Sequence, residues 1–60
     1  MNNKKQYDLK LIKQKLNVAM VLIEEIQNLI EDFPEVESSY LVDIMDDLEQ
    51  QYYEVQELQD

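Results

Sequence analysis

The sequence contains no cysteine and no histidine, and these two absences exclude several kinds of site. Without cysteine the chain has no disulfide and no thiolate ligand for a metal ion. Without histidine it lacks the commonest transition-metal ligand and a frequent general base. Arginine and tryptophan are absent as well. We therefore expect no catalytic residues, no metal site and no bound cofactor, and we interpret the chain as a protein that is not an enzyme.

Glycine is also absent, and the only proline is Pro34. Both residues disfavour the interior of a helix, so a 60-residue chain with one proline near its middle is typical of two helices joined by a turn. We predict a single domain over residues 1–60, with a helix over about 5–32, a turn over 33–38 and a second helix over about 39–58. Ser38 or Ser39 is expected to cap the second helix through its side-chain oxygen, unless that helix begins earlier, with Pro34 in its first turn.

Apolar residues recur in the first helical segment at alternating steps of three and four. The pattern runs without a miss through Leu9, Ile12, Leu16, Ala19, Ile23, Ile26, Ile30 and Phe33. Such a heptad pattern indicates a helix that packs against a partner helix. The second segment has a matching stripe, made of Leu41, Ile44, Met45, Leu48, Tyr52, Val55 and Leu58. Because Gln51 occupies a heptad position, we expect Tyr52 to turn inward beside it. The fold class predicted is all-α, an antiparallel two-helix hairpin.

The charges are distributed unevenly along the chain. The net charge is −9, yet all five lysines lie within the first fifteen residues and thirteen acids follow from Leu16 onward. An antiparallel hairpin brings the basic start to the acidic end. The expected neighbours are Lys10, Lys13 and Lys15 on one helix and Glu54, Glu57 and Asp60 on the other. Exposed ion pairs of this kind contribute about 0–1 kcal/mol each, but they favour this register over slipped ones.

Two features do not fit a solitary hairpin. The run Val18–Ile23 is apolar around the whole helix, and one neighbour covers only part of that circumference. The first helix is also longer than the second, which leaves an overhang that carries Tyr7 and Leu9. We therefore expect a homodimer of hairpins that forms a four-helix bundle. The expected oligomer interface is Leu9, Val18, Val21 and Leu22. The alternative is an apolar patch reserved for a different protein.

Acidic side chains crowd the outer faces of both predicted helices. Between Glu24 and Glu49 there are ten acids and no cation. One use of such a surface is to meet a basic patch on another protein, with electrostatically steered association. The simpler interpretation is a solvated face. The expected partner-binding residues are Glu24, Glu25, Asp43, Asp46, Asp47 and Tyr53.

These observations favour a small acidic protein that regulates or inhibits an unidentified protein partner through its helix surfaces. One alternative is a DNA mimic whose acidic faces block a nucleic-acid-binding protein, and another is a structural coiled-coil assembly component. Direct binding to nucleic acid or to an anionic membrane is not expected, because phosphate groups need clustered cations. The apolar run Val18–Ile23 is too short to span a bilayer, so we expect a cytoplasmic protein. The usage of Asn, Lys and Ile is typical of low-GC bacteria, their phages and their plasmids.

Overall fold

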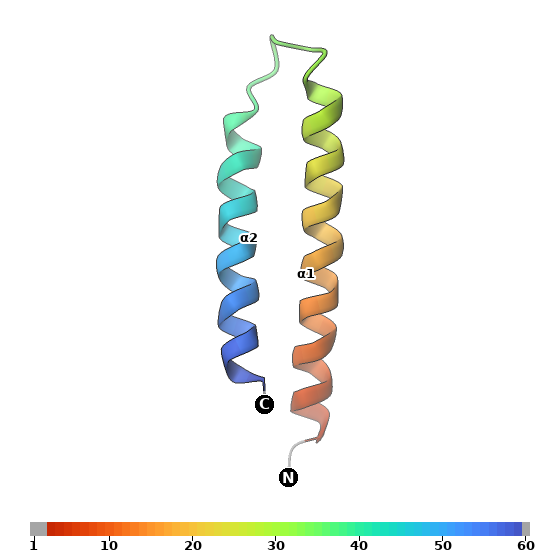
Figure 1. Ribbon diagram of the computed structural model, residues 1–60, viewed down its shortest axis with the longest axis vertical. Helices are drawn as coiled ribbons and strands as arrows, with labels where there is room; N and C mark the ends of the chain where they lie inside the picture. Colours follow the sequence, from red (N-terminus) through yellow and green to blue (C-terminus); the bar gives the residue numbers. More distant parts are fainter. Residues whose placement is uncertain (1–2, 60) are drawn as a thin grey trace.

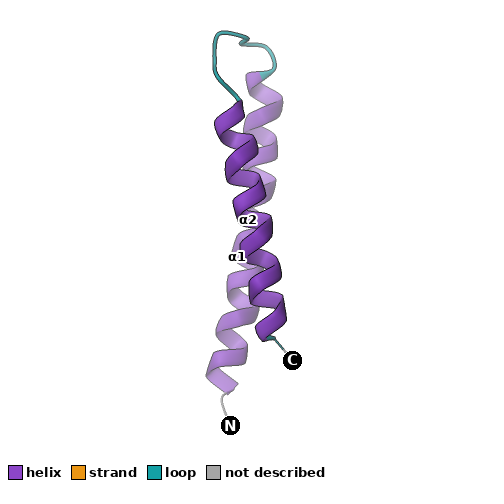
Figure 2. Cartoon of the chain, turned by 90° about the vertical axis from the view of Figure 1, so that its left-hand side faces the viewer, coloured by secondary structure: helices purple, strands orange, loops and turns teal. Residues whose placement is uncertain are grey.

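A computed structural model describes residues 3–59 as two α-helices joined by a turn. Helix α1 spans Asn3–Ile30 and helix α2 spans Ser39–Leu58. The helices lie side by side and run in opposite directions (Figure 1), and the second view shows that they cross at a small angle (Figure 2). The hairpin is a flat rod with principal extents of 52 × 15 × 11 Å. The prediction of an all-α antiparallel hairpin is therefore confirmed. Within the described residues, neither helix is long and apolar enough to cross a membrane.

The turn between the helices begins two residues earlier than expected, directly after Ile30. The amide of Phe33 donates to the carbonyl of Ile30 at 2.7 Å, and the amide of Val36 donates to the carbonyl of Phe33 at 3.0 Å. Pro34 disfavours helical geometry at Phe33, so the helical hydrogen-bond ladder is replaced by two successive tight turns. These turns reverse the direction of the chain before Ser39.

The start of α2 is stabilised by a side chain other than the expected serine. Ser38 occupies the N-cap position, but its side chain makes no capping hydrogen bond. Its backbone has φ −94° and ψ −7°, whereas a capping serine normally needs an extended backbone. Instead, the Ser39 amide donates to the Glu37 carboxylate at 3.1 Å. The prediction of a serine cap is wrong, because the helical backbone angles of Ser38 do not bring its side chain to the amides that a cap would accept from.

Contact between the helices is made by half-buried side chains, which we call the interhelical seam. On α1 these are Leu9, Lys13, Leu16, Ala19, Met20, Ile23, Gln27 and Ile30. On α2 they are Leu41, Met45, Leu48, Tyr52, Val55 and Gln59, the last of these one residue beyond the helix end. Apart from the adjacent pair Ala19 and Met20, both sets advance in steps of three and four residues, as packed helices require. Tyr52 points inward while its neighbour Gln51 is exposed, as expected.

The seam on α1 differs from the predicted heptad pattern in one row of residues. The row Leu9, Leu16, Ile23 and Ile30 faces α2 as expected, but Ile12, Ile26 and Phe33 remain 44%, 44% and 55% exposed. The adjacent row of Lys13, Met20 and Gln27 faces α2 in their place. One neighbouring helix covers only a limited stripe of another helix, so it contacts one flanking row and leaves the other free. The free row is the aliphatic one of Ile12, Ile26 and Phe33, in which only the small Ala19 is half-buried.

The basic start of α1 meets the end of α2 through a neutral side chain. Lys13 Nζ donates to Gln59 Oε1 at 2.9 Å and lies 5.2 Å from the centre of the Tyr52 ring. The only ion pair within residues 3–59 joins Lys4 and Asp8 on the same helix, at 3.1 Å. The prediction of lysine–acid ion pairs between the helices is therefore not met within residues 3–59. Lys13 lies in the seam, and this position directs its ammonium to Gln59 and Tyr52 instead of to an acid. Asp60 lies outside the described residues.

The half-buried seam predicts a difference between two valines of α2. Val55 lies in the seam, whereas Val42 is 50% exposed on the same helix. Val55→Ala should lower the free energy of unfolding by about 1 kcal/mol, because it removes two partly buried methyl groups. Val42→Ala, the matched control, should change it by less than about 0.5 kcal/mol. Urea unfolding followed by circular dichroism measures both, and equal losses would contradict the assigned seam.

The contact at the start of α2 predicts a pH dependence. The hydrogen bond from the Ser39 amide, aided by the Ser39 side chain, lowers the pKa of the Glu37 carboxyl from its usual value. A lowered pKa in the folded state means that this contact stabilises α2 at neutral pH and that the stabilisation is lost as the pH falls through the folded pKa. An NMR titration should give Glu37 a lower pKa in the folded chain than in the urea-unfolded chain. Glu37→Gln should remove this part of the pH dependence, and equal pKa values in the two states would contradict the assignment.

Candidate protein-interaction surfaces

No described side chain of the hairpin is fully buried, whether apolar or polar. Even the seam residues are only half-buried, because two helices enclose no volume between them. Large apolar side chains therefore remain in contact with solvent on several sides of the hairpin. Such surfaces, when they are contiguous, mark contacts with other proteins. The two broad faces of the hairpin are therefore the candidate surfaces for contact with another protein.

One broad face is aliphatic, and we call it the uncovered apolar face. It consists of Ile12, Leu22, Ile26 and Leu29 of α1 with Ile44 and Leu58 of α2, all of them exposed. Ile12 and Ile26 each stand three residues after a seam residue of α1, and Ile44 and Leu58 each stand three residues after a seam residue of α2. Because the helices run antiparallel, these positions lie on the same side of the hairpin. Leu22 and Leu29 lie one row further out, and Leu29 is 70% exposed. The face therefore follows a second heptad pattern along the length of α1.

The opposite broad face contains a groove between the helices, with a volume of about 550 Å³. It is lined by Asn17, Met20, Val21, Glu24, Met45, Glu49, Tyr52 and Tyr53. None of these residues belongs to the uncovered apolar face. The two faces therefore lie on opposite sides of the seam, one aliphatic and the other with acidic and aromatic side chains.

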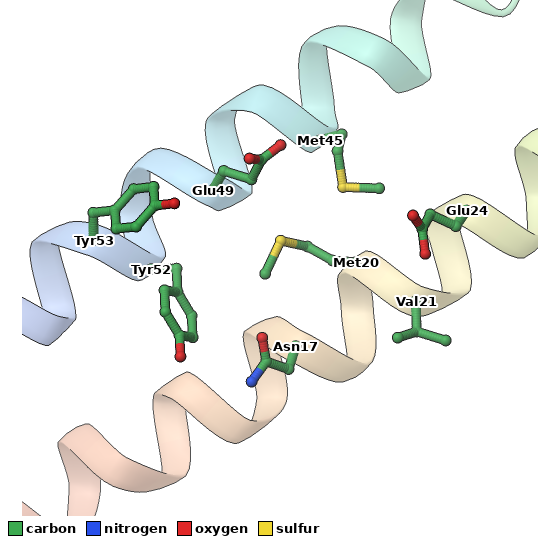
Figure 3. A pocket seen from close by; sticks show the side chains of 8 residues that line it. All are labelled: Asn17, Met20, Val21, Glu24, Met45, Glu49, Tyr52 and Tyr53. Carbon is green, nitrogen blue, oxygen red and sulfur yellow. The ribbon is translucent and has the colours of Figure 1, made fainter.

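The side chains of the groove come from both helices (Figure 3). Met20 of α1 and Met45 of α2 both project into the space between the helices, and Tyr52 reaches across toward Asn17. Glu24 and Glu49 stand on opposite walls, whereas Val21 points away from α2 at the outer edge. The rings of Tyr52 and Tyr53 meet edge to face with centroids 6.0 Å apart. The groove thus has a thioether floor, two carboxylates at its rim and an aromatic end.

The four residues expected at an oligomer interface do not share one face. Leu9 is half-buried in the seam and faces α2, where it lines a small hollow together with Leu58. Leu22 belongs to the uncovered apolar face, and Val18 is exposed on the outer side of α1 next to it. Val21 lies at the edge of the groove on the other side. A single contact therefore cannot use both Leu22 and Val21 in the same way.

The acidic residues expected to bind a partner are likewise spread around the hairpin. Glu24 and Tyr53 both line the groove. Glu25 is exposed on the outer side of α1, and Asp43, Asp46 and Asp47 are exposed on three different rows of α2. The groove therefore brings together two residues of the predicted set of six.

Sequence reasoning missed most of the groove residues, namely Asn17, Met20, Met45, Glu49 and Tyr52. The sequence pattern places Met45 and Tyr52 in the apolar stripe of α2, but it places Met20 only in the apolar run Val18–Ile23. The usable signal was the row of Lys13, Met20 and Gln27, which repeats every seven residues beside the main heptad row. A flexible methionine in that row, opposite a second methionine, is typical of an adaptable contact surface.

The carboxylates of the described residues do not form a cluster of three or more with metal-site geometry. No protein-family model, no curated protein and no solved structure matches the chain.

Proposed function

We propose that this chain is a small acidic regulator that binds another protein, and that it acts as a homodimer in which two hairpins form a four-helix bundle. The observation that supports the proposal is the uncovered apolar face. Two adjacent heptad rows of α1 are apolar. Helix α2 covers the row that includes Leu9 and leaves Ile12 and Ile26 of the other row exposed. A helix with two adjacent apolar seams is typical of a bundle with more than two helices.

The exposed area of the hairpin supports a second copy as the occupant of the uncovered apolar face. The hairpin exposes 5102 Å², whereas a compact folded chain of 7.2 kDa exposes roughly 4,100 Å². The excess of about 1,000 Å² per copy corresponds to about 2,000 Å² in a symmetric pair, the lower end of the range for obligate homodimers. The radius of gyration, 14.7 Å against about 10 Å for a compact 60-residue domain, indicates the same deficit of packing. A second hairpin laid face to face supplies the missing layer.

The surface that such a dimer leaves free is acidic. From Glu24 to Glu57 the chain has twelve acids and no cation, and none of those acids forms an ion pair within the described residues. Dimerisation doubles this uncompensated charge on one particle. A basic surface on another protein is the complementary partner, and its association is accelerated by electrostatic steering.

A DNA mimic is the second candidate function. The observation that favours it is the exposure of Asp43, Asp46 and Asp47 on α2, none of which has a partner among the described residues. Carboxylates held on a rigid helix resemble the phosphates of a nucleic acid to a protein with a basic cleft. A structural role in a larger coiled-coil assembly, by contrast, requires no partner other than further copies of the chain.

The dimer is tested by sedimentation equilibrium over a wide concentration range. Leu22→Asp should raise the dissociation constant at least about 100-fold, because the leucine is lost twice in a symmetric interface and two charges are placed against apolar surface. Val21→Asp is the matched control, since it introduces the same charge one residue away on the groove side, and it should leave the dimer within about tenfold of the unchanged chain. A monomer at all concentrations, or equal effects of the two substitutions, would overturn the proposed assembly.

The partner is tested by affinity capture from an extract of the source cell. We expect a protein with a basic surface that the unchanged chain retains. The triple variant Asp43→Asn, Asp46→Asn, Asp47→Asn should retain it more weakly but not lose it, because nine of the twelve acids from Glu24 to Glu57 remain. If the triple variant loses the partner and the partner binds nucleic acid, the DNA-mimic function is correct instead. Recovery of this chain alone would favour the structural role and contradict the regulator.

A further inference from the structure

We propose that the groove between the helices binds an amphipathic, basic α-helix of another protein, with one lysine or arginine seated between Glu24 and Glu49. This inference rests on the proposed function, since it names the class of partner that the regulator recognises. The groove lies on the face opposite to the uncovered apolar face, so a second copy on that face leaves the groove open. Each dimer therefore offers two such grooves.

The floor of the groove suits apolar side chains of a partner. Met20 and Met45 approach from the two helices and leave a hollow of about 550 Å³ that is open to solvent (Figure 3). Methionine is unbranched and polarisable, so a pair of methionines adapts its shape to different aliphatic side chains. Such thioether surfaces are used where a protein receives the apolar side of a helix. The floor therefore supplies the apolar half of the recognition.

The rim of the groove carries the charge that selects a basic partner. Glu24 on α1 and Glu49 on α2 stand on opposite walls, both exposed. Neither carboxylate forms an ion pair or a side-chain hydrogen bond within residues 3–59. A cation placed between the walls interacts with both carboxylates at once, and its aliphatic stem lies over the methionine floor. An acidic or neutral helix gains no such contact.

One lysine of the hairpin itself already lies against an aromatic ring that lines the groove. Lys13 is half-buried in the seam, with its ammonium 2.9 Å from Gln59 Oε1 and 5.2 Å from the centre of the Tyr52 ring. Tyr52 also lines the groove, so the groove continues along the seam from the ring that Lys13 contacts. Tyr53 adds a second ring, packed edge to face on Tyr52. Aromatic faces attract cations, and arginine benefits more than lysine because its planar guanidinium also stacks.

A helical partner fits the groove better than an extended one. An extended strand binds by adding to the edge of a β-sheet, and residues 3–59 contain no strand. On α1 the lining runs from Asn17 to Glu24, about 10 Å or two helical turns. A partner helix spans this length with anchors at positions i, i+3 or i+4, and i+7, which is the helix-in-groove mode. The bound complex then has a third helix lying along each hairpin.

The test uses a peptide of about 18 residues made of leucine and lysine in an amphipathic helical order, with a scrambled peptide of the same composition as its control. Isothermal titration calorimetry should show tighter binding of the ordered peptide. The double variant Glu24→Gln, Glu49→Gln should weaken that binding about tenfold or more. The matched double variant Asp43→Asn, Asp46→Asn removes the same charge outside the groove and should weaken it by less than about threefold. Equal weakening by the two variants, or equal binding of the two peptides, would overturn the proposal.

A second readout locates the peptide without any substitution. On addition of the ordered peptide, NMR amide shifts should change most over residues 17–24 and 45–53. Largest changes at Ile12, Ile26 and Ile44 would place the peptide on the uncovered apolar face and overturn the groove. Sedimentation of each variant separates the two proposals. A dimer that binds the peptide outside the groove would refute the groove alone, whereas a monomer would refute the proposed assembly.

Discussion

The structure depends on one constraint, which is that a single neighbouring helix covers only part of a helix that is apolar around much of its circumference. Helix α1 has apolar residues in two adjacent heptad rows and beyond them. Helix α2 covers one side, so that even the seam is only half-buried and no described side chain is removed from solvent. The free energy of such a hairpin is small, because the hydrophobic contribution scales with the area buried. We propose that a second copy supplies a further layer of helices along the aliphatic row that includes Ile12 and Ile26.

The same constraint explains why the two broad faces of the hairpin differ. The row that includes Lys13 and Met20 faces α2 because long, flexible side chains reach over a neighbouring helix while their polar ends stay near water. Because this row faces α2, branched aliphatic residues remain on one face of the hairpin, and methionines, tyrosines and glutamates lie on the other. Aliphatic surface suits a permanent contact between copies, and a methionine groove with charged walls suits a partner that is bound and released. The division of the surface thus follows from which row α2 covers.

Much of the fold could be predicted from the sequence, but the surfaces only in part. Pro34 and the heptad row from Leu9 to Ile30 suffice to predict two antiparallel helices. The central row of the heptad pattern has one neighbouring row at a spacing of three residues and another at a spacing of four, on its two sides. Heptad spacing alone does not reveal which of these two rows contacts the partner helix. Ile12 and Ile26 were therefore placed in the seam, and Met20 was not. The Ser38 cap failed for a local reason, because backbone angles decide whether a side chain reaches an amide.

The central claim, that a second copy covers the uncovered apolar face, is tested most directly by isotope-filtered nuclear Overhauser spectroscopy on a mixture of labelled and unlabelled chains. The account predicts contacts between copies at the methyl groups of Leu22, Ile26 and Leu29, and none at Val42, which lies away from that face. A spectrum without any contact between copies would contradict the account. So would contacts between copies that involve Met20 and Met45, because the groove would then be part of the dimer interface.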